Sequence, residues 1–186
     1  MAAAAKNRVR DQRSQAMVEF AIIAPLLLFL IFGIVDFGRV IYVYITLNQA
    51  VNEGVRVAIR DSPLLPTNAD VESAAKIHAV DVSLANPCPN GPITSTAPPA
   101  NQGWIYITEP NPPSTVESLS PTLENAPGGQ MWAFDNGICS ATNPAYNHAP
   151  LQVTIRYNFV PITPLIKQFI NGNLVILAGA VYRTEY

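Results

Sequence analysis

The chain has 186 residues, enough for one membrane segment and one domain of ordinary size. Hydrophobic residues make up 49% of it and charged residues only 13%, about half the charged share typical of soluble domains. Seven Lys/Arg and four Asp/Glu fall within residues 1–60, whereas four and nine fall in the remainder. The acidic C-terminal part argues against a nucleic-acid-binding role, which favours a basic face.

The N-terminal region combines a basic leader with a long apolar run. Residues 1–14 are polar and basic, whereas residues 16–35 contain a single charged side chain, Glu19. A run of this length matches the roughly 20 residues that a helix needs to cross a bilayer core. Because basic residues precede the run, the positive-inside rule predicts a cytoplasmic N-terminus and an exported C-terminal part.

The apolar run is predicted to be a retained anchor and the first part of a longer helix. A secretory signal peptide would have a shorter apolar core and a small-residue cleavage site after it. Here the apolar pattern resumes after Asp36, so we expect one continuous helix over residues 15–61, with a mild kink at Pro25. Asp36 and Arg39 share a helix face and can pair at the outer membrane boundary, which is an ordinary role for such a pair.

The outer half of this helix is expected to be amphipathic. Apolar residues recur there at spacings of three and four, which indicates one face packed on a domain. These residues are Tyr44, Leu47, Val51, Val55, Ala58 and Ile59. Asn52, Arg56 and Arg60 occupy another face, which either meets solvent or contacts neighbouring subunits.

Residues 62–186 are predicted to form an exported α+β head with Pro-rich loops. Sixteen of the 17 prolines fall in this part. A short helix is expected from Asn68, capped by that residue. Alternating or β-branched patterns predict strands at 104–108, 151–159 and 174–184, the last two antiparallel, with a short helix at 165–170 between them. The fold class is therefore a lollipop: a long helix packed on a small head with an antiparallel sheet.

The two cysteines, Cys88 and Cys139, both lie in the part expected to be exported. In an oxidising compartment such a pair is most simply a disulfide, although two unpaired buried thiols are the alternative. The bond would close a loop of about 50 residues and stabilise the head by roughly 4 kcal/mol.

The sequence contains no motif for catalysis, phosphate binding or metal binding. His-Glu-x-x-His, Gly-x-Ser-x-Gly, Gly-rich phosphate loops and Cys-x-x-Cys are all missing, and there are only two histidines. We therefore expect a non-enzymatic protein without a cofactor or a metal.

The long helix resembles the TadE-like family, whose members are pilin-like proteins of the tight-adherence (Tad/Flp) type IV pilus system. The resemblance is strong over residues 13–60, moderate over 151–186 and missing in between. Its N-terminal part is carried by residues 13–21, 25–28, 33–39 and 52–58, and its C-terminal part by residues 153–157, 161–164 and 183–185.

The resemblance implies processing by a membrane-embedded prepilin peptidase. In the family the leader is removed just before a segment whose fifth residue is Glu, which places the cut between Ser14 and Gln15 and gives Glu19 a role in assembly. Most members carry Gly before the cut, where this chain has Ser14. The carboxylate of Glu19 would neutralise the new terminal amine of a neighbouring subunit within the membrane.

The resemblance further implies a structural function. The chain is expected to be a minor pseudopilin, anchored in the inner membrane with a periplasmic or extracellular head, that helps pilus initiation, assembly or tip formation. A minor position is expected because major pilins of this system are much shorter. Its partners would be the membrane, the major pilin, other minor pilin-like subunits and the inner-membrane platform. The alternative is a single-pass anchored binding or scaffold domain outside any pilus.

Overall fold

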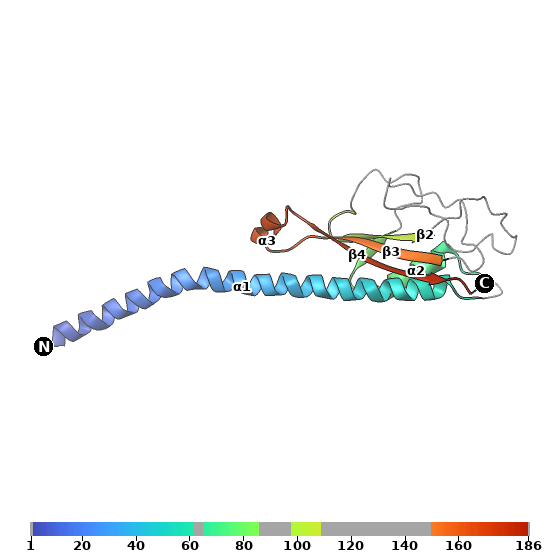
Figure 1. The fold of residues 1–186 in the computed structure, drawn as a ribbon. Coiled ribbons are helices and arrows are strands. Elements are labelled where there is room, and N and C mark those ends of the chain that lie inside the picture. The colour runs from blue at the N-terminus through green and yellow to red at the C-terminus, as the bar shows by residue number, and fades with distance from the viewer. Residues whose placement is uncertain (1, 62–64, 86–97, 109–149, 186) are drawn as a thin grey trace.

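The computed structural model describes residues 2–61, 65–85, 98–108 and 150–185, with side chains from Gln15 onward. A single helix, α1 (Ala2–Ala58), runs the length of the molecule and is about 85 Å long at 1.5 Å per residue. Figure 1 shows its N-terminal part projecting beyond a small head and bending gently, and the helix contains one proline, Pro25. The predicted α+β lollipop is confirmed.

The head is built on a four-stranded sheet in the order β1-β2-β3-β4. Its strands are β1 (Ser83–Ala85), β2 (Gln102–Thr108), β3 (Pro150–Phe159) and β4 (Leu174–Arg183). The antiparallel pairing of β3 with β4 was predicted. Strand β2 also pairs antiparallel with β3. The short β1 adds a parallel edge to β2 that was not predicted, since three residues with one branched side chain give no strand pattern.

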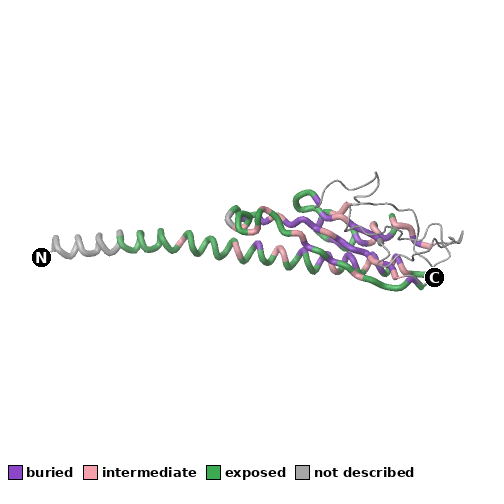
Figure 2. Tube along the Cα trace, turned by 45° about the horizontal axis from the view of Figure 1, so that its top comes forward, coloured by how far each residue is buried: buried purple, intermediate pink, exposed green. Residues whose placement is uncertain are grey.

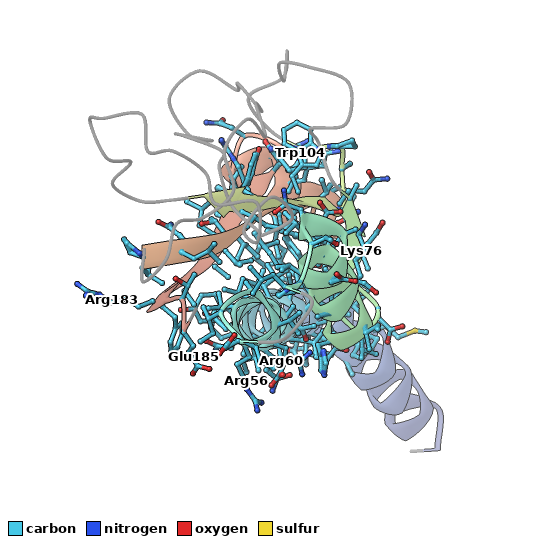
Figure 3. The ribbon with its side chains drawn as sticks, turned by 90° about the vertical axis from the view of Figure 1, so that its right-hand side faces the viewer. Arg56, Arg60, Lys76, Trp104, Arg183 and Glu185 are labelled. Atoms are coloured by element: carbon cyan, nitrogen blue, oxygen red, sulfur yellow. The ribbon has the colours of Figure 1, made fainter. Side chains whose placement is uncertain are left out.

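The core lies between the outer half of α1 and one face of the sheet. Helix α1 contributes Val43, Leu47, Ala50, Val51, Val55 and Ala58, all buried. They pack in one cluster with inward-facing residues of β3 such as Val153 and Ile155. The predicted stripe is largely confirmed, although Tyr44 is exposed and Val43 is buried in its place. On the far side of the helix, Arg56 and Arg60 point away from the sheet (Figure 3).

A second helix, α2 (Asn68–His78), packs beside α1. The residue that caps it is Thr67, one position before the expected Asn68, and Asp70 completes a capping box. The backbone N–H and the hydroxyl of Thr67 both donate to Asp70, which lowers the pKa of that carboxyl. Asn68 was predicted as the cap because Asn is a preferred capping residue. The signal for Thr67 is the acidic residue three positions after it, which completes the capping box.

The end of β4 is tied to the end of α1. The backbone N–H of Glu185 donates to the carbonyl of Ile59 at 2.9 Å, and Thr184 beside it is buried. The last strand therefore runs along α1 as far as the point where that helix ends.

Leu47→Ala tests the packing of α1 on the sheet. Leu47 is fully buried, so we expect this substitution to lower the free energy of unfolding by about 2–5 kcal/mol through lost burial and a cavity. The measurement is denaturant unfolding of the full chain in detergent. Ile45→Ala, at a half-exposed position on the same helix, is the matched control and should change stability by less than about 0.5 kcal/mol. Equal effects of the two substitutions would contradict this packing.

Candidate functional site

From Gln15 to Val35, α1 exposes a surface that is apolar except for a few polar side chains. Figure 2 shows the described part of this segment as almost wholly exposed, whereas buried residues begin where the head meets the helix. The helix over Gln15–Ala58 is long and apolar enough to cross a membrane, and none of its most apolar window is buried within the described residues. The exposed side chains include Met17, Phe20, Ile22, Leu26, Leu30 and Ile34. Since water is a poor solvent for such a surface, this segment needs an apolar environment from outside the described head.

Glu19 is the single charged side chain described within this apolar surface. Its Oε1 accepts a hydrogen bond from Nε2 of Gln15 at 3.1 Å, one helical turn earlier. Both residues are exposed, as are the apolar neighbours Val18 and Phe20. Ser14 lies in the same helix, although its side chain is outside the described part. The sequence-predicted processing residues and Glu19 thus lie within two turns of helix, and their roles stay predictions.

A second polar group on α1, Asp36, connects the helix to the head. It is 3% exposed, although it directly follows the apolar run. Its Oδ1 accepts from the backbone N–H of Ile162 at 3.1 Å, and its Oδ2 accepts from the N–H of Thr163 at 3.0 Å. These two donors precede the short helix α3 (Pro164–Phe169), so Asp36 holds the entry to α3 against α1.

Arg39 completes this junction. Its Nη1 lies 3.3 Å from Oδ1 of Asp36, which confirms the predicted pair. The guanidinium carbon lies 5.1 Å from the centroid of the Phe159 ring, within the range of a cation–π interaction. Arg39 therefore joins the carboxylate on its own helix to the last residue of β3.

The hydrogen bonds around Asp36 keep it ionised. Burial by itself would raise the pKa of this carboxyl, but the bonds from Thr163, Ile162 and Arg39 outweigh it and lower the pKa below its ordinary value. An ionised carboxylate accepts several bonds at once, as this site requires. The site is thus suited to attaching the turn before α3 to α1.

The role of Asp36 was missed in the sequence. Asp36 was interpreted as an ordinary boundary residue paired with Arg39, because its partners are more than 120 positions away in the chain. A signal was present in the turn 161–164, where prolines on both sides leave two backbone N–H groups without a regular ladder partner. A lone carboxylate that interrupts an apolar run is a natural acceptor for such donors.

The predicted disulfide cannot be placed in this site. Cys88 and Cys139 lie outside the described residues. Among the residues that the structure describes, no group of three or more His, Cys, Asp and Glu side chains is arranged to hold a metal ion.

An apolar helix long enough to span a membrane, followed by an α+β head packed on its outer half, is the arrangement of a protein with one candidate membrane span and a lollipop-like fold. Residues 15–56 match the model of the family described as TadE-like protein, which confirms the resemblance inferred from the sequence. The match lies wholly within α1 and contains both Glu19 and Asp36. No curated protein and no solved structure matches the chain. The family match and the apolar helix fit a membrane protein associated with the Tad pilus.

Asp36→Asn tests the junction between helix and head. An amide offers one acceptor oxygen where the carboxylate offers two, so one buried N–H loses its partner, at a cost of about 1–3 kcal/mol. We expect faster hydrogen exchange at the amides of Ile162 and Thr163 and a lower free energy of unfolding. Glu53→Gln, which removes a surface ion pair with Arg56 on the same helix, is the control and should change little.

The effect of Asp36→Asn should depend on pH. Because the folded pKa of Asp36 is lowered, its stabilisation is complete above the unfolded value, about 3.9, and is lost as pH falls through the folded pKa. The stability difference between wild type and variant should therefore be constant near neutral pH and shrink below about pH 4. A difference that stays the same into strong acid would contradict the ionised junction.

Proposed function

We propose that this chain is a minor pilin-like subunit of a Tad/Flp-type pilus. The N-terminal half of α1 anchors it in the inner membrane, with the N-terminus cytoplasmic and the head outside. From there it is built into or onto the pilus with the major pilin and related minor subunits, at the inner-membrane platform. It helps in pilus initiation, in pilus assembly or in formation of the pilus tip, and it thereby supports adhesion.

The observation that carries this proposal is the exposed apolar half of α1 within the segment that matches the TadE-like family. A helix with apolar side chains on all sides is stable in lipid, and it is equally suited to a bundle of similar helices. The same surface can therefore serve in both environments, first as an anchor and then as a lateral contact between subunits.

Glu19 supplies a polar contact that could set the register of such a bundle. A carboxylate within a membrane helix costs about 2.5–3.5 kcal/mol or more unless it finds a partner, and the neutral amide of Gln15 is a weak one. A cut between Ser14 and Gln15 creates an α-amino group that is positive at neutral pH. Pairing of this group with Glu19 of a neighbouring subunit offsets the desolvation of both charges.

The mature N-terminus tests whether the leader is removed. We expect the chain isolated from cells that contain a prepilin peptidase to begin at Gln15, as read by mass spectrometry of its N-terminal peptide. The matched Ser14→Gly variant, which restores the residue most family members carry, should be cut at the same bond and at least as fully. An intact leader in both chains would instead favour a single-pass anchored binding or scaffold domain.

Glu19→Gln tests the assembly role. The amide keeps the size of the side chain and removes its charge, so membrane insertion should be unchanged while incorporation into sheared pili falls severalfold. The measurement compares the amount of this chain in the membrane fraction with that in the pilus fraction. Glu53→Gln makes the same chemical change on the outer half of α1 and should leave both amounts unaltered. Normal incorporation of the Glu19→Gln chain would refute the pairing.

A further inference from the structure

The connection between β3 and β4 projects from the head as a separate arm. We define this arm as residues 160–173, which contain α3 and the turn after it. Figure 1 shows α3 beyond the end of the sheet, on the side of the projecting half of α1 and alongside that helix. The turn that closes the arm has Asn171 and Gly172 with positive φ, and the N–H of Gly172 donates to the carbonyl of Lys167 at 2.7 Å.

The arm is held at a fixed height along α1. Asp36 accepts from the N–H groups of Ile162 and Thr163, as described above. Below that point, a Cβ atom placed on Gly33 would lie 4.0 Å from Cδ1 of Ile166, which is ordinary van der Waals contact. Gly33 is within the apolar run 16–35, about 3 Å of helical rise from its outer end. The arm therefore lies beside the last turn of the membrane segment.

The arm carries large apolar side chains that the described head leaves uncovered. Phe169 is 80% exposed and Ile162 is 70% exposed. Lys167 is exposed on the same short helix. Two apolar side chains and a basic one at the outer boundary of a membrane helix match the composition of an interfacial segment.

We propose that the arm enters the outer interface of the lipid bilayer, with Phe169 and Ile162 in contact with acyl chains and Lys167 directed to lipid phosphates. Because Ile166 of the arm lies close to Gly33 in the last turn of the span, lipid that surrounds this turn would also reach the arm. The chain would then contact the membrane at two points, α1 and the arm. This inference rests on membrane anchorage by α1 and is independent of any role in a pilus.

Site-specific photocrosslinking of the full chain in vesicles of phosphatidylethanolamine and phosphatidylglycerol tests the proposal. The photoreactive residue p-benzoylphenylalanine replaces Phe169 in one variant and Ile162 in a second. If one variant fails to fold, the other still tests the proposal. Phe29, exposed in the middle of the apolar run, is the positive control position. Ile77 is the matched negative control, because it is an apolar residue of the head that is 71% exposed and lies on α2.

The readout is the fraction of each peptide that carries one added phospholipid, measured by mass spectrometry after irradiation. We expect lipid adducts at positions 169 and 162 to exceed those at 77 severalfold and to approach those at 29. Adducts at 169 and 162 no greater than at 77, with normal labelling at 29, would overturn the proposal. Crosslinking of the arm to a second copy of the chain in place of lipid would also overturn it. Because no pilus component is present, neither result bears on the proposed role in a pilus.

Discussion

Helix α1 is continuous, but its apolar run is suited to lipid and its amphipathic half is suited to water. The arrangement of the rest of the molecule follows from this constraint. In lipid every backbone N–H and C=O must be paired within the segment, which an uninterrupted helix achieves. In water the same helix needs cover for its apolar stripe, and the sheet provides it at Leu47, Val51 and Val55. The head therefore covers α1 from the point at which its apolar run gives way to the amphipathic part.

That transition is marked by one buried carboxylate. Asp36 sits between the apolar run and the amphipathic half, where a charge facing lipid would be costly. Bonds from two backbone N–H groups and from Arg39 stabilise it there, and they also satisfy a turn that has no ladder partners. Glu19 has no comparable set of donors among the described residues, so the two carboxylates of the apolar region differ in chemistry. Asp36 is satisfied within its own chain, whereas Glu19 is suited to a partner from another.

The sequence contained enough to predict the helix, its apolar run and the two long strands, because each follows from local periodicity. The stripe from Leu47 to Ala58 and the alternation in β3 are properties of neighbouring residues. Contacts between distant parts of the chain could not be predicted in this way. The bond from Ile162 to Asp36 joins residues 126 positions apart, and the parallel pairing of β1 with β2 joins Ser83 to Gln102. The roles of Ser14, Gln15 and Glu19 depend on other molecules, so they stay predictions.

The head is fastened to α1 at both of its ends, by Asp36 near the membrane and by the bond from Glu185 to Ile59 at the far end. These two points are 23 residues apart along the helix, roughly 35 Å. Both attachments oppose rotation of the head about α1, so a change in the tilt of the helix would carry the head with it. A change of about 10° in the tilt of α1 would sweep the distal end sideways by roughly 6 Å. Bilayer thickness influences helix tilt, so it would also change the position of the distal end of the protein relative to the membrane.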